Sequence, residues 1–322
     1  MRTRIKIFLL FVSLLLVGQF TDFKGPNLVC ADTSKPLAPL PATSSFIDQI
    51  DEAPYYSVEA PTQPPLLRWD FSGKRVYSYS YSQKISSIGH FYTELEGDDT
   101  PEPATTSELK GKMFLKSEGD RTARLVLEDL KVIMELDIPE SEEPKQMESQ
   151  APPMVIQGVQ EDGTMKLGGT AQEILLKTLF PIPPTALKVG ESVSVPATMP
   201  FNAMGSALYV TGTSVTTLTD YVALYGRTCA KLETIIDIST LKVPEELKGT
   251  YRCQVRGKSV FFFDVQGKRF LSGRVALIMG MRVEAPMPKM SFPSEAEDAA
   301  DLPETVRMSM DNDNFISVDY VE

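Results

Sequence analysis

The sequence predicts a mainly β protein, an antiparallel sandwich or partly open barrel that carries one short amphipathic helix. The first observation is alternation with period two, clearest in "RVYSYSYSQKI" at 75–85, which is typical of strands with one buried and one wet face. The second is a set of short polar joints that contain glycine and favour hairpins. The third is a single segment whose apolar residues repeat at helical spacing.

Eight segments alternate with period two or are rich in the β-branched and aromatic residues that strands prefer. They span residues 75–85, 90–95, 112–116, 122–138, 207–218, 230–238, 251–265 and 270–283. The joints "EGD" at 118–120, "EDG" at 161–163 and "QGK" at 266–268 lie between or beside them. Neighbours in sequence are therefore expected to be antiparallel neighbours in space.

The segment "GTAQEILLKTLFP" predicts the helix, at 170–180. Thr170 and Glu173 form a capping box, and Pro181 forces the helix to stop. Four residues share one face at helical spacing: Ile174, Leu175, Thr178 and Leu179. Because an isolated helix this short is marginal in water, we expect that face to plug an open edge or end of the sheet.

Residues 1–31 are predicted to be a signal peptide. A basic start precedes an apolar run that is too short to span a bilayer, and small residues precede the expected cut after Ala31. The mature protein is then exported to the periplasm, the outer envelope or the medium of a bacterium, with no membrane span. Attachment of a lipid at Cys30 is the alternative.

The remaining chain divides into three parts. Residues 32–65 repeat proline without an apolar period and are expected to form an extended linker and not a packed element. Contact of Tyr55 and Tyr56 with the domain is left open. Residues 66–285 have a length that suits one antiparallel β domain, and two tandem β units are the alternative. Residues 286–322 are expected to form an acidic, proline-rich tail, in which two short strands flank the turn "DNDN" and either dock as an edge hairpin or are loosely held.

The mature chain is strongly acidic. Cleavage removes four basic residues and one acidic residue from totals of 32 and 43, which leaves 28 against 42 and a net charge of −14. Such a surface repels nucleic acid and anionic lipid, since the sequence has no basic cluster longer than a residue or two. We therefore expect no nucleic-acid partner and attribute the acidity to solubility.

Cys229 and Cys253 are the candidates for a disulfide. They are the two cysteines of the mature chain, which is bound for an oxidising compartment, and they lie in two successive apolar segments. If these segments pair as a hairpin, the two cysteines approach each other across the ladder. Two buried free thiols are the alternative.

Tyr77, Tyr79 and Tyr81 are the candidate ligand-binding residues. On a strand the three rings point to one face and the intervening serines to the other. The rings either fill the core, with their hydroxyls reaching main-chain groups or rim water, or line a concave face that binds a sugar, a peptide or an apolar ligand. The serines are the natural wet face, which favours the core.

No catalytic residue, metal site or cofactor is predicted. The single histidine, His90, lacks the partners of a triad or a zinc site, and the sequence has no phosphate-binding, esterase or zinc-protease motif. Calcium at the acidic run 311–314 and copper at the methionine pairs 279/281 and 308/310 are weighed against a polar turn and core packing, and we favour the latter.

A carboxylate-based glycoside hydrolase stays as an alternative, because it needs only two acids about 5 to 10 Å apart. The acids in or beside predicted strands are Glu128, Glu135, Asp137, Glu233, Asp237 and Asp264. Their abundance makes some close pair inevitable, so the sequence does not single out any two of them.

The layout resembles that of uncharacterised exported bacterial β-rich proteins, grouped as a domain of unknown function. The matching motifs are "FSGKRVYSYSYSQ", "LFPIPPTALKVGESVSVP", "YGRTCAKLE" and "VFFFDVQGKRFLSGR", all within residues 66–285. These are turn and strand patterns, so the resemblance implies a β fold and no particular activity.

These observations lead to a first hypothesis and two alternatives. The first is a non-enzymatic envelope protein, a binding or structural β domain that meets an unknown partner or ligand through a sheet face or its loops. The second is a periplasmic carrier that holds a lipid-like molecule between its concave sheet and the helix at 170–180. The third is the carboxylate hydrolase.

Overall fold

The computed structural model describes residues 37–51, 53–92, 105–136, 145–166, 171–203, 206–245, 247–286 and 305–322. This part of the chain forms twelve strands, one α-helix and one short 3-10 helix. In chain order they are η1 (Ile47–Gln49), β1 (Tyr56–Ser57), β2 (Val76–Tyr92), β3 (Thr105–Gly119), β4 (Thr122–Leu136), β5 (Lys145–Gln150), β6 (Met154–Gln160), α2 (Ala171–Leu179), β7 (Ser192–Ala203), β8 (Ser206–Leu224), β9 (Arg227–Lys242), β10 (Thr250–Asp264), β11 (Arg269–Pro286) and β12 (Thr305–Val321).

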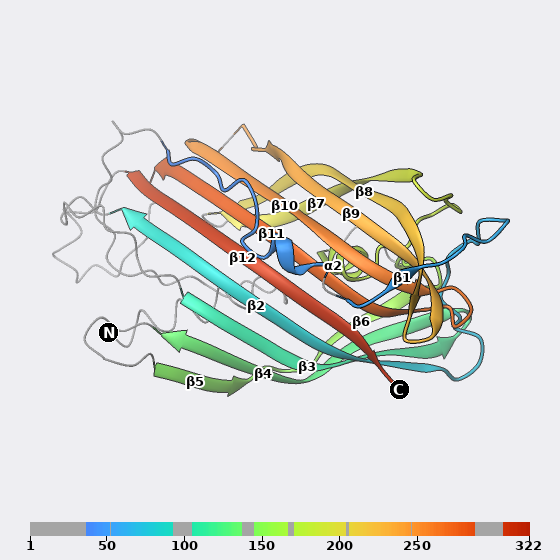
Figure 1. Cartoon of the computed structure of the whole chain (residues 1–322). Helices are drawn as coiled ribbons and strands as arrows, with labels where there is room; N and C mark the ends of the chain where they lie inside the picture. The colour runs from blue at the N-terminus through green and yellow to red at the C-terminus, as the bar shows by residue number, and fades with distance from the viewer. Residues whose placement is uncertain are drawn as a thin grey trace.

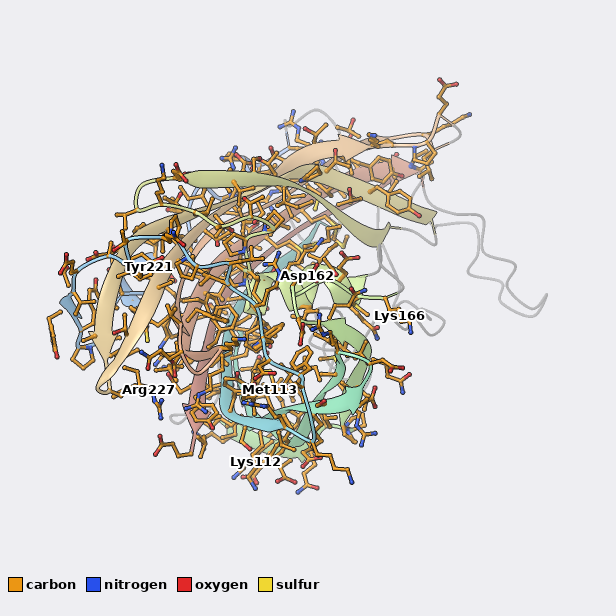
Figure 2. All side chains as sticks on the ribbon, turned by 90° about the vertical axis from the view of Figure 1, so that its right-hand side faces the viewer. Lys112, Met113, Asp162, Lys166, Tyr221 and Arg227 are labelled. Atoms are coloured by element: carbon orange, nitrogen blue, oxygen red, sulfur yellow. The ribbon has the colours of Figure 1, made fainter. Side chains whose placement is uncertain are left out.

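All twelve strands belong to one antiparallel sheet, so the predicted mainly β fold is confirmed (Figure 1). The strand order is β1-β8-β9-β10-β11-β12-β2-β3-β4-β5, with β6 also beside β4 and β7 also beside β8. The sheet curls around its inner face without closing, which is the partly open barrel of the two predicted architectures (Figure 2). Helix α2 contacts the edge strand β7, in line with the expected plug at a sheet edge. Its buried residues are Leu176 and Leu179, so of the predicted face only Leu179 is fully buried.

The two ends of the sheet differ in how the strands connect. At one end, here called the turn end, tight turns join β3 to β4, β8 to β9 and β10 to β11. Asp120 and Arg121 both take positive φ values (48° and 57°), as do Tyr225 and Gly226 (50° and 72°), the two-residue geometry that matches the twist of paired strands. At the opposite end, here called the loop end, most connections pass through residues outside the described ranges.

The inner face near the turn end is filled by aromatic side chains. Trp69 packs against Phe71, Phe180 and Phe270 with ring centroids 5.0 to 5.7 Å apart. The helix contributes fully buried leucines to the same cluster. Side chains therefore occupy the space between helix and sheet, where the carrier hypothesis placed its ligand.

Strand β12 corrects the predicted boundary at 286 and the predicted edge hairpin. It is one continuous strand in the middle of the sheet, paired with β11 on one side and β2 on the other. The run "DNDN" is no turn, because side chains on both faces of the sheet supply partners for its polar groups. Asp311 lies 2.7 Å from Arg282 on the outer face, and Asn314 accepts from Gln83 at 3.0 Å on the inner face.

Strand β2 is longer than predicted. The segments 75–85 and 90–95 were expected to be two strands, but they merge into Val76–Tyr92. The physical reason is that β12 supplies a pairing partner along the whole length, from Ser78 to Tyr92.

Residues 37–58, here called the strap, correct the prediction of an unpacked linker. The strap is extended as predicted, but it crosses the outer face from β12 to β8 (Figure 1). Asp313 accepts the Ser45 main-chain N–H at 2.6 Å and the hydroxyls of Ser44 and Ser45. Further along, Lys231 donates to the Asp51 carboxylate at 2.7 Å.

Apolar residues of the outer face explain why the strap packs. Ile50 is buried in a cluster that contains Val222 and Phe262, an apolar patch that would otherwise face water. A glycine also makes room, since a Cβ added to Gly280 would clash with the ring of Pro41. Composition alone therefore did not reveal that this proline-rich segment belongs to the folded domain.

The predicted disulfide is wrong, because Cys229 and Cys253 are free and buried. They lie on neighbouring strands, but the register pairs Cys229 with Asp264, which is at the opposite end of β10 from Cys253. The alternative of two buried thiols is the correct one.

Candidate functional site

The tyrosine row lies in the core and not on an exposed binding face. Tyr77, Tyr79 and Tyr81 are 3%, 1% and 2% exposed. The Tyr77 hydroxyl donates to the main-chain oxygen of Asp70 at 2.7 Å, and the Tyr81 hydroxyl donates to Gln83 at 2.9 Å. Burial raises the pKa of Tyr81 well above its usual range, so the hydroxyl stays protonated. The structure does not present these rings to a ligand.

A belt of polar side chains crosses the inner face beyond the aromatic core. Gln83 donates to Asn314 at 3.0 Å, and the hydroxyls of Thr216 and Thr234 lie 3.0 Å apart. Ser259 is also buried, and its hydroxyl has no hydrogen-bond partner in the part of the chain that the structure describes. The belt divides the inner face into a turn half and a loop half.

The loop half of the inner face is apolar again and rich in methionine. Its buried cluster is Val210, Ile236, Ile238, Cys253 and Val255, and beside it lie Met279, Met281, Met308 and Met310. Met281 and Met310 are direct neighbours across β11 and β12. The methionine pairs thus pack among apolar side chains, as predicted from their spacing.

The acids considered for a hydrolase are held by separate neighbours. Glu233 lies 2.7 Å from the Lys258 ammonium, and the buried Asp264 accepts the Gly267 main-chain N–H at 2.8 Å. Asp137 lies outside the described residues. None of the other five acids lines the pocket at the turn end.

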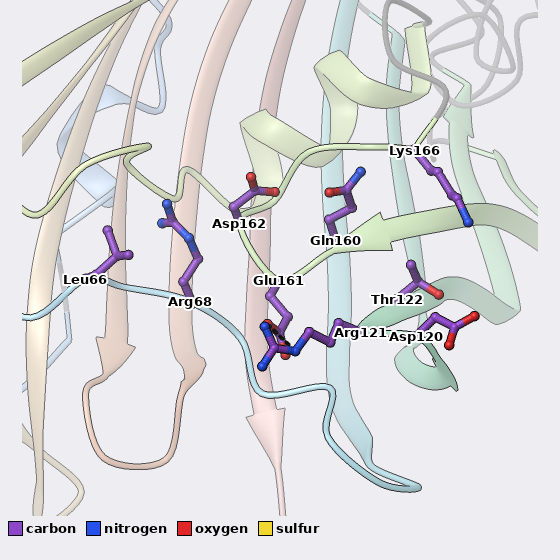
Figure 3. A pocket seen from close by; sticks show the side chains of 9 residues that line it. All are labelled: Leu66, Arg68, Asp120, Arg121, Thr122, Gln160, Glu161, Asp162 and Lys166. Atoms are coloured by element: carbon purple, nitrogen blue, oxygen red, sulfur yellow. Dashed lines mark ion pairs between the residues drawn. The ribbon is translucent and has the colours of Figure 1, made fainter.

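This pocket, of about 560 Å³, is formed where the chain before β2 meets the β3–β4 turn and the end of β6 (Figure 3). It is lined by Leu66, Arg68, Asp120, Arg121, Thr122, Gln160, Glu161, Asp162 and Lys166. Main-chain pairing fixes the three segments, because Trp69 donates to the oxygen of Glu161 at 2.9 Å and Thr122 pairs with Gln160 in the sheet.

Two carboxylates of the pocket accept hydrogen bonds from main-chain N–H groups. Glu161 accepts the N–H of Phe71 at 3.3 Å, and Asp162 accepts the N–H and the hydroxyl of Thr164 at 3.0 and 2.6 Å. These bonds fix the loop, so the two acids are structural parts of the pocket wall.

Two cations of the pocket remain open to a ligand. The Arg121 side chain is 84% exposed and comes no nearer than 4.0 Å to Glu161. Lys166 is exposed and has no ion pair among the described residues. Asp120 extends to the other side of its turn from Arg121 (Figure 3). Arg121 and Lys166 thus offer charged donors that suit an anionic group.

Sequence reasoning missed this pocket. The joint at 161–163 was interpreted only as a hairpin signal, and the basic residues come from positions far apart in the chain. Only the pairing of β4 with β6 brings Arg121 and Lys166 to one place. No local motif in the sequence contains that information.

Acidic side chains do not gather as metal ligands in the part of the chain that the structure describes. There, no three His, Cys, Asp or Glu side chains form such a group, and Asp311 and Asp313 serve Arg282 and the strap. Within the same ranges, no helix has the length and apolarity needed to cross a bilayer.

Comparison with known proteins finds no matching family model and no matching curated protein. The resemblance to exported bacterial β-rich proteins stays a prediction. Function is therefore inferred from the site itself.

Proposed function

We propose that the protein is an exported, non-enzymatic binding domain that recognises an anionic group in the pocket at the turn end. The observation that carries this proposal is the contrast within the pocket wall. Glu161 and Asp162 are engaged by main-chain donors, whereas the charges of Arg121 and Lys166 face solvent. Charged donors next to a fixed wall favour a carboxylate or phosphate group over a neutral one.

The scaffold supports a binding role. Trp69 and Phe71, which flank the pocket segment before β2, are anchored in the aromatic core. The core thus holds the pocket segments in place before a ligand arrives, which lowers the entropy lost on binding. Loops positioned by a rigid sheet are a common place for binding residues.

The proposed export of the protein is inferred from residues 1–31, which precede the strap. The basic and apolar start of the sequence motivates export through a signal peptide at 1–31, with the folded domain acting in the envelope or outside the cell. Sequencing the N-terminus of the protein recovered from a periplasmic or culture fraction tests this, and an unprocessed chain in the cytoplasm would contradict it.

Glycerol 3-phosphate is a suitable soluble probe for the pocket. We expect isothermal titration at low salt to show binding that the double variant Arg121→Asn, Lys166→Gln weakens about ten-fold or more, because charge-assisted bonds are lost. Asparagine tolerates the positive φ at position 121. The matched control is Arg256→Gln, Lys248→Gln, which removes two cations elsewhere. Absent binding, or equal loss in both variants, contradicts the proposal.

A second candidate function is a carrier of an apolar ligand at the loop half of the inner face. The methionine row at Met279, Met281, Met308 and Met310 motivates it, because flexible thioether side chains adapt to varied apolar shapes. Native mass spectrometry of the purified protein decides. A retained lipid-sized adduct supports the carrier, and a clean apo mass counts against it.

A further inference from the structure

Half of the large apolar side chains that are exposed in the described part of the chain lie at the turn end. Six of the large ones lie there: Tyr56, Leu66, Val76, Val189, Tyr225 and Val321. The two tyrosines protrude most, with Tyr56 69% and Tyr225 72% exposed. They are close neighbours, because Tyr56 pairs with Ala223, just before the turn that Tyr225 forms. Single exposed apolar residues are ordinary, but a ring of them on one end marks an interaction surface.

Exposed lysines stand at the same end. Lys74, Lys166, Lys188 and Lys268 are exposed and form no ion pair within the described ranges. Three of them lie within two residues of an exposed apolar residue or share a wall with one: Lys74 with Val76, Lys188 with Val189, and Lys166 with Leu66 in the pocket.

Several acids of the turn end have partners within the protein, whereas Asp120 and Glu322 there are exposed. Asp70 accepts the N–H and the hydroxyl of Ser72, and Glu191 accepts the N–H of Lys188 at 2.8 Å. Asp220 accepts from Ser57 at 2.5 Å and from the Tyr221 N–H at 2.8 Å. These carboxylates are turned toward the protein, whereas the lysine ammonium groups face outward.

Contacts between the turns make this a continuous surface. Arg227 beside the β8–β9 turn lies 3.4 Å from Asp264 at the β10–β11 turn and 3.7 Å from Glu322 at the chain end. The pKa of Asp70 is lowered first by its bonds from Ser72, and Lys268 from the β10–β11 turn is near enough to contribute. Figure 2 views this end and labels Asp162 and Lys166 of the pocket together with Arg227.

From this arrangement we infer that the turn end docks on an anionic lipid bilayer, with Tyr56 and Tyr225 at the level of the headgroups and the lysines on lipid phosphates. The inference rests on the proposed function, because it names a phosphate-bearing lipid surface as the partner of the same end. Binding of a soluble anion would leave the six exposed apolar side chains in contact with water. Exposed side chains at the tips of several turns can contact one flat, deformable surface together. Aromatic rings beside basic residues are also typical of membrane interfaces.

The net charge of −14 predicted that the protein as a whole repels anionic lipid. The fold brings exposed lysines together at the turn end, where they can attract it. Screening confines the interaction to groups within about 10 Å of the lipid at ordinary salt, so the charges that count are those of the docked end. In this orientation the loop half, with its methionine row, faces away from the bilayer.

Sedimentation with vesicles tests the inference. Full-length processed protein is mixed with vesicles of phosphatidylcholine alone or of phosphatidylcholine and phosphatidylglycerol, at low and high salt. We expect binding to the mixed vesicles only, with loss at high salt. Lys188→Gln, Lys268→Gln should weaken it about twenty-fold. Tyr56→Thr, Tyr225→Asn should weaken it by a similar factor, and asparagine again suits the positive φ.

The matched controls remove the same number of positive charges and of exposed apolar side chains, at positions away from the turn end. Lys84→Gln, Lys248→Gln removes two exposed lysines elsewhere, and Tyr209→Thr, Ile235→Thr removes two exposed apolar side chains of β8 and β9. Both controls should bind as the parent does. Equal losses in controls and test variants, equal binding to neutral vesicles, or no binding at all overturns the inference. Glycerol 3-phosphate binding without vesicle binding overturns the lipid inference alone, and loss of both removes the proposed function too.

Discussion

The two halves of the inner face are filled by different kinds of side chain. In the turn half, rigid rings interlock: Phe180 lies within 5.0 to 6.4 Å, centroid to centroid, of Trp69, Tyr79, Phe261 and Phe270. In the loop half, aliphatic side chains pack beside flexible methionines. The polar belt around Gln83 and Asn314 separates the two. The turn half thus resembles a fixed support, and the loop half an adaptable packing.

The difference coincides with connectivity. Tight turns close three hairpins at the aromatic end and fix the strands there, so the groups they carry keep their positions. This is the end that presents the pocket and the exposed tyrosines. A precise arrangement of binding groups is easier to maintain on such a support than on adaptable packing.

The largest expected effect comes from opening a cavity in each half. Phe180→Ala should lower the free energy of unfolding by about 4 kcal/mol, because its ring neighbours cannot collapse into the space. Ile238→Ala in the loop half should cost about 2 kcal/mol, because the adjacent Met199 and Met279 can refill part of the cavity. Urea denaturation followed by circular dichroism measures both.

Equal losses would break the comparison. Equal slopes of free energy against urea for the parent and both variants serve as the control that unfolding remains two-state. A loss at Ile238 larger than at Phe180 would show that the loop half is the more rigid one.

An intermediate effect is expected from the strap, which crosses the outer face of both halves. Asp313→Ala removes the acceptor for Ser44 and Ser45 and should cost about 1 to 3 kcal/mol. Amide hydrogen exchange should rise in residues 39–47 and stay unchanged in β3. Asp319→Ala is the matched control. Asp319 lies on β12, as Asp313 does, and accepts hydrogen bonds from Ser272 and Arg274 of β11 instead of from the strap. Faster strap exchange in the control would contradict this account.

The smallest effect concerns the thiols, which lie on different faces of the sheet: Cys253 in the loop half of the inner face and Cys229 in the outer-face cluster beneath the strap. Burial raises the pKa of Cys229 and of Cys253 to about 12, from an ordinary value near 9. Unfolded thiols ionise near pH 9 and folded ones do not, so the stabilisation that they contribute is complete below pH 9 and is lost as the pH rises toward 12. Each thiol should therefore resist alkylation at about pH 8 in the folded protein.

Variants with a single remaining cysteine sharpen this test. We expect Cys253, in the loop half of the inner face, to be alkylated faster than Cys229, which lies near the β8–β9 turn beneath the strap. Labelling requires local opening, and methionine packing is expected to open more easily than strands closed by a tight turn. The control is urea-unfolded protein, in which both should react at the same rate. Faster labelling of Cys229 would show that the outer face beneath the strap opens more easily than the loop half.

Sequence patterns predicted the local features well, for identifiable reasons. Alternation at 75–85 placed all three tyrosines on one face, because side chains on a strand alternate regardless of context. The glycine joints at 118–120 and 266–268 lie at hairpin turns of the structure, and the helix expected at 170–180 is present as Ala171–Leu179. Thr170, its expected cap, lies outside the described residues.

The errors share one cause, which is that they required knowledge of distant partners. The run at 311–314 looked like a turn, and it is a strand because β11 and β2 flank it and Arg282 and Gln83 meet its polar groups. The strap looked like a linker because its prolines have no apolar period. Its contacts with Asp313 and Lys231 join residues that are far apart in the chain.

The sequence by itself determined the long alternating strands, the hairpin turns at 118–120 and 266–268 and the buried face of the tyrosine strand, because those properties depend on backbone preferences and on neighbours one or two positions away. It did not predict the strands at 145–150, 154–160 and 192–203. Only the tertiary structure decided which strands sit side by side, what covers the outer face, and that lone basic and apolar residues from separate turns meet on one end. That surface is a sum over distant segments, so no stretch of the chain encodes it locally.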